Sequence, residues 1–189
     1  MEAGAVLSGA LSEEEFTRRA RALEWLLFDV DGVLTDGLLT YGAGGEELKV
    51  FHVRDGLALK LAQRAGLKVG ILSGRGAAAL STRARELGLD AVVLDRADKG
   101  AAFAEFLAEY RVEPERVAYT GDDLLDLPVL ARCGLSFAPA DAVAEVRARV
   151  HRVLERDGGR EAVREMIEAV LRARGDWDRL VARWVDEAS

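Results

Sequence analysis

The sequence predicts an α/β protein built on a doubly wound parallel sheet with a protruding β-hairpin. The first observation is that short apolar runs alternate with amphipathic helical patterns, which is typical of a parallel sheet covered on both faces. The second is that the first apolar run ends in acidic residues, as in a buried strand whose end opens on a site. The third is a strand, a glycine-rich turn and a second strand over residues 38–53, which interrupt the alternation.

Each element has a local signal. An S-x-x-E capping box that begins at Ser12 predicts a lead-in helix that ends at about residue 23. Apolar runs predict strands over 25–30, 67–72, 91–94, 117–120 and 135–138. Helical periodicity between them predicts helices over 57–65, 77–87, 100–110 and 123–132, and this periodicity returns after residue 160.

Length and composition indicate one globular domain. The chain has 189 residues, of which 50% are hydrophobic and 31% are charged, enough apolar material for a single core. We therefore expect one domain over 1–189, with the hairpin at 38–53 and a C-terminal tail with helices at 156–189. The net charge of -7 argues against a nucleic-acid partner, because binding to the phosphate backbone depends on clustered positive charge.

Neither a membrane span nor a secretion signal is expected. No stretch approaches the roughly 18 uncharged residues of a membrane span, and the start carries Glu2 where a signal peptide carries positive charge. Cys133 is the only cysteine, so neither an intrachain disulfide nor a multi-cysteine zinc site can form. These features predict a cytoplasmic protein.

Acidic side chains follow two of the predicted strands. Asp29 and Asp31 end the first strand two positions apart, so strand alternation points both carboxylates to the same side. Ligands of open α/β sheets bind beyond the carboxyl ends of the strands, where this pair falls. Taken alone, the pair could equally be an ordinary turn. Three more acids follow the strand over 117–120, namely Asp122, Asp123 and Asp126.

A helix N-terminus would account for one or two of these three acids, but not for all of them. At one sheet edge the two acidic groups would repel each other, and some of their pKa values would rise unless a cation neutralised them. A site made of oxygen ligands suits Mg²⁺, which commonly completes its shell with waters and a substrate phosphate.

Two further residues could bind an anion. Ser73 and the amides around Gly74 follow the strand over 67–72 at a helix start, which is a ready anion site. Lys99 begins another helix, where its charge opposes the helix dipole unless it serves a ligand. An N-cap serine and a surface lysine are the alternative interpretations of these two residues.

In this order the motifs resemble those of the haloacid dehalogenase superfamily of phosphatases. The resemblance implies that Asp29 attacks phosphorus to form an aspartyl-phosphate and that Asp31 is the general acid and base. It implies that Ser73 and Lys99 hold the phosphoryl oxygens. It also implies a Mg²⁺ ion bound by Asp29, the backbone carbonyl of Asp31 and Asp122, with Asp123 and Asp126 in support.

Further segments narrow the resemblance to the capless subgroup and to the 3-deoxy-D-manno-octulosonate 8-phosphate phosphatase family: residues 34–37, 45–49, 51–56, 74–75, 121–128 and 158–165. That family implies no cap domain, hydrolysis of the phosphorylated sugar acid for lipopolysaccharide synthesis, and a homotetramer formed through the hairpin. By matching position it implies these substrate contacts: Asp31, His52, Val53, Arg54, Asp55, Gly56, Lys60, Gly74, Arg75, Arg83 and Lys99.

Three departures from the family pattern leave the substrate open. His52 stands where the family often has Asn, Asp95-Arg96 where it usually has Gln-Gly, and Glu161 where it has Gly. A nine-carbon ulosonate 9-phosphate or another phosphosugar is therefore an alternative substrate. Two other classes are a phosphorylation-switched receiver module, whose acids normally precede the phosphorylated Asp, and a non-catalytic tetramerisation module, against which the intact acidic set argues.

Overall fold

The computed structural model describes residues 9–186. Glu2 and the two ends of the expected domain over 1–189 lie outside this range, as does the end of the tail expected over 156–189. The main sheet has six parallel strands in the order β5-β4-β1-β6-β7-β8. Their bounds are β1 Trp25–Phe28, β4 Lys68–Leu72, β5 Ala91–Val93, β6 Val117–Thr120, β7 Leu135–Ala138 and β8 Arg152–Val153.

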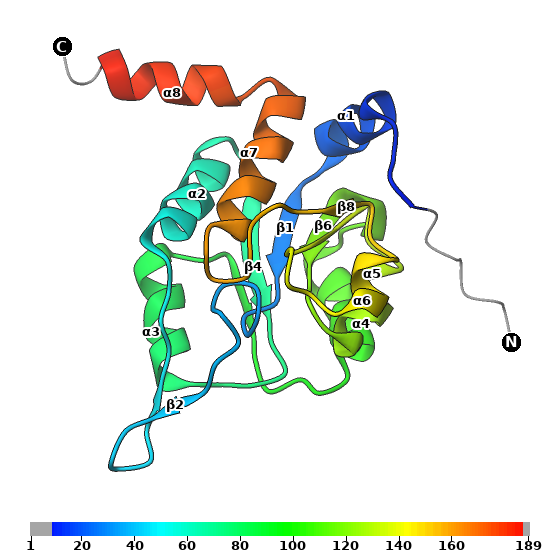
Figure 1. The fold of residues 1–189 in the computed structure, drawn as a ribbon. Helices are drawn as coiled ribbons and strands as arrows, with labels where there is room; N and C mark the ends of the chain where they lie inside the picture. The colour runs from blue at the N-terminus through cyan, green and yellow to red at the C-terminus, as the bar shows by residue number, and fades with distance from the viewer. Residues whose placement is uncertain (1–8, 187–189) are drawn as a thin grey trace, which may run out of the picture.

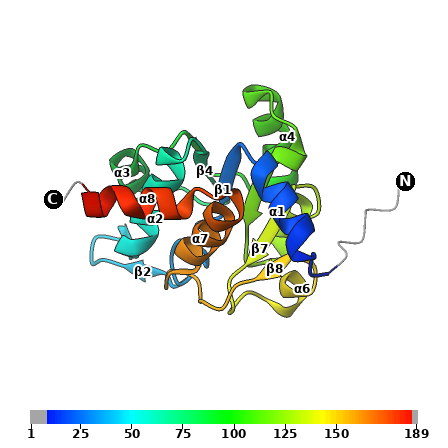
Figure 2. The same cartoon turned by 90° about the horizontal axis from the view of Figure 1, so that it is seen from above.

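Helices cover both faces of this sheet (Figures 1 and 2). The core on one face includes side chains of α1 Glu13–Ala22, α2 Val53–Arg64, α3 Ala78–Leu87, α7 Ala162–Arg174 and α8 Trp177–Asp186. The core on the other includes those of α4 Lys99–Tyr110, α5 Leu127–Leu130 and α6 Ala144–Arg147. Strand β1 serves both, because Leu26 and Phe28 face the first core while Trp25 and Leu27 face the second. The predicted doubly wound fold is confirmed.

The hairpin consists of β2 Thr40–Tyr41 and β3 Glu47–Leu48, paired antiparallel, and it projects from the molecule (Figure 1). It is shorter than the predicted 38–53, since Val53 already belongs to α2. His52 ends the extended segment by capping α2: its Nδ1 accepts a hydrogen bond from Arg54 N at 3.3 Å. Between β1 and β4 the described chain contains only this hairpin and α2, so it includes no cap domain.

One other prediction needed correction, and two elements were not predicted. The helix expected over 123–132 is split into a 3₁₀ turn, η2 Leu124–Asp126, and the short α5. Two features favour the split: the side chains of Asp123 and Asp126 form a capping box, and Pro128 near the start of α5 supplies no N–H. Strand β8 and helix α6 were missed, because elements of two and four residues are too short to show a period.

Within residues 9–186, every helix is too short or too polar to cross a lipid bilayer.

Candidate active site

The candidate site lies where the strand order reverses. From β1 the sheet extends through β4 to β5, and the later strands extend from β6 on the other side of β1. Crevices of this kind, beyond the carboxyl ends of the strands, are where open α/β sheets bind ligands. Asp29 follows β1 and Asp122 follows β6. Pairing of the two strands continues past their ends, because Asp29 N donates to Thr120 O at 3.0 Å.

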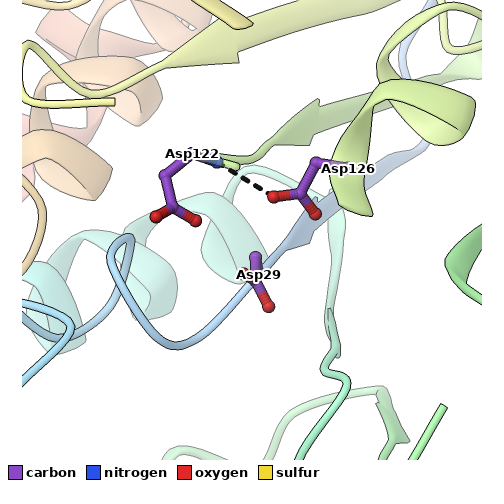
Figure 3. Close-up of side chains that lie close together, drawn as sticks. All are labelled: Asp29, Asp122 and Asp126. Carbon is purple, nitrogen blue, oxygen red and sulfur yellow. Dashed lines mark hydrogen bonds between the residues drawn. The ribbon is translucent and has the colours of Figure 1, made fainter. Parts of the chain in front are cut away.

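Three carboxylates meet at this point (Figure 3). Asp29, Asp122 and Asp126 each offer one oxygen, and these oxygens lie within 4.8 Å of one another. Asp29 and Asp126 are buried and Asp122 is half-buried. The Oδ1 atom of Asp122 is buried and has no hydrogen-bond partner among the described residues. Such an atom is unusual in a folded protein and fits a site that binds a cation.

Asp126 is the structural centre of this cluster. Its Oδ1 accepts hydrogen bonds from Lys99 Nζ and from the Tyr119 hydroxyl, both at 2.6 Å. Its Oδ2 accepts from the backbone amides of Asp122 at 3.0 Å and Asp123 at 3.2 Å. Both oxygens of Asp126 are thus engaged by donors, so Asp29 and Asp122 are better placed to bind a metal ion. Lys99 Nζ also lies 2.8 Å from Asp29 Oδ1, and the Lys99 side chain is 3% exposed.

The electrostatics of the cluster favour a bound cation. Burial, followed by repulsion from Asp126, raises the pKa of Asp29 to about 6. Burial and repulsion from Asp29 raise the pKa of Asp122 to about 8. Burial alone would lower the pKa of Lys99, but the charges of Asp29 and Asp126 outweigh it, so the ammonium form is favoured. The donor set consists of oxygens only and carries excess negative charge, so these residues fit Mg²⁺.

The loop after β4 forms another wall of the same cavity. Ser73 is 1% exposed, and its hydroxyl donates to Arg75 O at 2.9 Å and accepts from Arg75 N at 3.2 Å. The cavity has a volume of about 250 Å³. It brings together the following predicted site residues: Asp29, Asp31, Ser73, Gly74, Arg75, Lys99, Asp122, Asp123 and Asp126.

Glu47 and Lys49, in the second half of the hairpin segment, contact two residues that line this cavity, Arg75 and Asp31. Lys49 Nζ is hydrogen-bonded to Asp31 Oδ1 and lies 2.7 Å from Glu47 Oε1. Glu47 Oε2 in turn accepts a hydrogen bond from Arg75 Nη2 at 2.9 Å. Both residues fall within 45–49, a segment that carries the family resemblance, but that resemblance gave neither of them a role; Lys49 is also one of only four lysines in a chain that otherwise uses arginine.

The other predicted substrate contacts lie elsewhere. His52, Asp55, Gly56 and Arg83 line a separate, mostly apolar cavity of about 20 Å³ between α2 and α3. Asp55 is 1% exposed, and its Oδ1 accepts a hydrogen bond from Arg164 N at 2.7 Å, so this carboxylate joins α2 to α7. The remaining three predicted contacts, Val53, Arg54 and Lys60, line neither cavity.

Two of the three departures from the family pattern face each other. Glu161 Oε1 lies 4.0 Å from His52 Nε2 and accepts a hydrogen bond from Arg54 Nη1 at 2.8 Å. Glu161 has a φ of 79°, in the left-handed region that favours glycine. The segment before it also approaches the site, because Gly159 N donates to Val33 O at 2.9 Å.

Comparisons with known proteins agree with this geometry. A family model described as haloacid dehalogenase-like hydrolase matches residues 42–134. The 3-deoxy-D-manno-octulosonate 8-phosphate phosphatase of Haemophilus influenzae is 44% identical over 153 residues, 81% of this chain and 85% of that protein. The protein of the same name from Salmonella typhimurium is 41% identical over 180 residues, 94% of this chain and 95% of that protein.

Solved structures give the same result. The phosphatase of that name from Moraxella catarrhalis, crystallised with magnesium ion, phosphate ion and KDO, matches with a TM-score of 0.88 at 32% identity, covering 90% of this chain and 98% of that chain. The Yersinia pestis phosphatase matches with a TM-score of 0.84 at 42% identity, covering 87% of this chain and 89% of that chain. The chain therefore belongs to the haloacid dehalogenase-like hydrolases, in the family of the 3-deoxy-D-manno-octulosonate 8-phosphate phosphatases.

Proposed function

We propose that the protein is a Mg²⁺-dependent phosphatase that hydrolyses 3-deoxy-D-manno-octulosonate 8-phosphate to the free sugar acid and phosphate. The observation that carries this proposal is the convergence of the acidic cluster, Ser73 and Lys99 on one cavity at the reversal of strand order. This cavity belongs to a chain 44% identical to a phosphatase named for that substrate.

In the proposed reaction Asp29 is the nucleophile. One of its carboxylate oxygens attacks phosphorus, the bond from phosphorus to the sugar oxygen breaks, and an aspartyl-phosphate forms. Water then attacks this intermediate and releases phosphate. Lys99 and Ser73 hold the phosphoryl oxygens, and the Lys99 ammonium lies close enough to Asp29, at 2.8 Å, to offset charge on the transferring group.

Asp31 is the proposed acid and base. It gives a proton to the sugar oxygen as that bond breaks, and it later takes a proton from the attacking water. Asp29, Asp122 and the backbone carbonyl of Asp31 would hold Mg²⁺, which supplies positive charge toward the phosphoryl group. Asp126 orients this set through Lys99 and the amide of Asp122.

The sugar acid's carboxylate needs a cationic partner. Arg75 lies on the wall of the cavity and is a proposed partner, because a guanidinium group can bind a carboxylate through two hydrogen bonds. The other residues proposed as substrate contacts from the family pattern, His52 to Gly56, Lys60 and Arg83, lie around α2 and α3. A nine-carbon ulosonate 9-phosphate or another phosphosugar is the alternative substrate, which the departures at His52, Asp95-Arg96 and Glu161 leave open.

The function is tested by phosphate release with and without Mg²⁺ from the eight-carbon ester, nine-carbon ulosonate 9-phosphates and hexose phosphates. Preference for the eight-carbon ester would support the proposal and a role in lipopolysaccharide sugar synthesis, for which we also propose a cytoplasmic location. Preference for a nine-carbon ester would change the proposed substrate and leave the proposed reaction unchanged. Asp29→Asn is the control, and release that survives this substitution would refute the assigned nucleophile.

We also propose that the hairpin mediates assembly into a homotetramer. Its outward side chains are apolar and exposed: Leu38, Leu39, Tyr41, Leu48 and Val50. A patch of this kind on a small projecting element is typical of a surface that another subunit covers. Light scattering should show that Leu48→Ser with Val50→Ser lowers the oligomeric mass. The control Val92→Ser changes an exposed valine on β5 and should leave the mass unchanged.

A further inference from the structure

Four side chains of alternating charge link the hairpin to the active site. Lys49 is bonded to Asp31 on one side and lies 2.7 Å from Glu47 on the other. Arg75 bonds Glu47 at 2.9 Å, and its Nε lies 4.0 Å from Asp31 Oδ2, which closes the ring. The ring joins three segments, the loop after β1, the loop after β4 and the second half of the hairpin.

The hairpin directs these charges inward. The side chains of Glu47 and Lys49 are only 14% and 2% exposed, whereas Leu48 and Val50 are 50% and 79% exposed. Extended backbone alternates in this way, so one side of the strand faces the site and the other faces outward. Lysine is almost never buried unless it is paired, and here both carboxylates that pair with it lie within this ring.

Lys49 also differentiates the two oxygens of Asp31. Its ammonium is bonded to Oδ1, while the nearest atom of Arg75 is too far from Oδ2 for a hydrogen bond. Proton transfer to a leaving oxygen requires the carboxyl group to be held in one orientation within hydrogen-bond reach. A carboxylate anchored through one oxygen presents the other at a defined place.

We propose that Lys49 is a positioning residue of the active site: its ammonium holds the carboxylate of Asp31 in the cavity, so the hairpin builds part of the site of its own chain. The inference rests on the proposed phosphatase activity, in which Asp31 exchanges a proton with the sugar oxygen. Glu47 fixes Lys49 in turn and is the second member of this support.

The test compares two leaving groups. A sugar alkoxide must be protonated as it leaves, whereas nitrophenolate leaves without a proton, so a defect in Asp31 orientation harms hydrolysis of the sugar ester selectively. We expect Lys49→Met to lower kcat/KM for the preferred sugar phosphate by about 10–100-fold more than for p-nitrophenyl phosphate. This factor is smaller than the full contribution of general acid catalysis, because Asp31 itself is still present. Lys49→Arg should restore most of the loss, and Glu47→Gln should show a smaller selective defect.

Lys68→Met is the matched control, because Lys68 is exposed at the first residue of β4, at the far end of that strand from the site. It should behave like the wild type with both esters. Thermal melting of each variant separates a folding defect from a defect in the site. Equal losses with both esters, or wild-type kinetics of Lys49→Met, would overturn the inference while the phosphatase proposal stands. A wild-type protein without Asp29-dependent phosphate release would overturn both.

Discussion

A β-carbon on Gly32 would lie 2.1 Å from Asp122 Oδ2, which is less than any non-bonded contact allows. Gly32 also has a φ of 86°, in the left-handed region. The loop that carries Asp31 therefore approaches the acidic cluster so closely that only glycine fits. The absence of a side chain at Gly32 therefore allows the Asp31 loop to lie against Asp122.

Gly32→Ala should inactivate the enzyme. The new methyl group would push Asp122 away from Asp29, and a displacement of about 1 Å is enough to cost on the order of 10²-fold in rate. Phosphate release and the Mg²⁺ concentration for half-maximal rate are the measurements. The matched control is Gly66→Ala, with a φ of 88° and no atom within 4 Å of the added carbon. It carries the same backbone strain and should keep its activity; equal losses in both variants would refute the steric explanation.

Asp126→Asn should destabilise the protein strongly. The two carboxylate oxygens of Asp126 accept hydrogen bonds from four donors. In asparagine one of these oxygens becomes an NH₂ group, which donates and therefore cannot accept from the donors that point at it. It would also leave Lys99 with one less carboxylate in a buried place, and breaking such a pair costs about 3–5 kcal/mol of unfolding free energy. Urea denaturation measures the change.

The control for Asp126 is Asp123→Asn. The Asp123 side chain is exposed and caps η2 by accepting a hydrogen bond from Leu124 N at 2.6 Å. Asparagine caps helices about as well as aspartate, so we expect a change below about 0.5 kcal/mol. Similar losses in the two variants would show that Asp126 has no special place in the cluster.

Some of the site could be predicted from the sequence and some could not. Asp29 and Asp122 follow apolar runs, so the pattern predicts that both lie at one edge of a parallel sheet. That they are neighbours at this edge depends on the pairing of β1 with β6, which the pattern does not give. The role of Asp126 as a hub depends on donors from Tyr119 on β6, Lys99 at the start of α4 and two backbone amides, and these meet because α4 packs beside η2. No periodicity encodes that. Lys49 lies in the family-like segment 45–49 but received no role, because alternation in a hairpin does not say which side faces a site.

Mg²⁺ should stabilise the protein more at high pH than at low pH. In the metal-free protein the pKa values of Asp29 and Asp122 are about 6 and about 8, above the value of about 3.9 for an unfolded chain. The folded state then binds more protons than the unfolded state in this window. The contribution of these groups to stability is therefore fully present below about pH 4 and is lost as the pH rises through these values.

A divalent cation replaces those protons, so the Tm increase on adding Mg²⁺ should be larger at about pH 8 than at about pH 5. Melting curves with Mg²⁺ or with a chelator, recorded at both pH values, measure the difference. Asp122→Asn removes one of the two carboxyl groups and should shrink the effect. Equal Tm increases at both pH values would contradict the assignment of the cation to this cluster.

Glu161→Gly should improve binding of a carboxylated substrate. Glu161 Oε1 accepts a hydrogen bond from Arg54 Nη1 at 2.8 Å. The family pattern assigns Arg54 to the substrate, so with Arg75 it is a second proposed partner of the substrate carboxylate, which would then compete with Glu161. An exposed ion pair is worth about 0.2–1 kcal/mol, so its removal should lower KM for the preferred sugar-acid phosphate by up to about fivefold. Stability should change little, because the lost pair is offset by relief of the left-handed strain, which is about 1 kcal/mol.

The comparison that isolates this effect uses a hexose phosphate, which lacks the carboxylate. Its KM should be the same in the wild type and in Glu161→Gly, because no group of that ester competes with Glu161. Arg54→Ala supplies the opposite case, since it removes the guanidinium itself and should raise KM for the sugar-acid ester only. If Glu161→Gly lowered KM for both esters alike, the carboxylate of Glu161 would be acting on the access of any phosphate to the site. In that case Glu161 would not compete with the substrate for Arg54. The presence of Glu161 in place of glycine would then not affect how the protein recognises the carboxylate of the sugar acid.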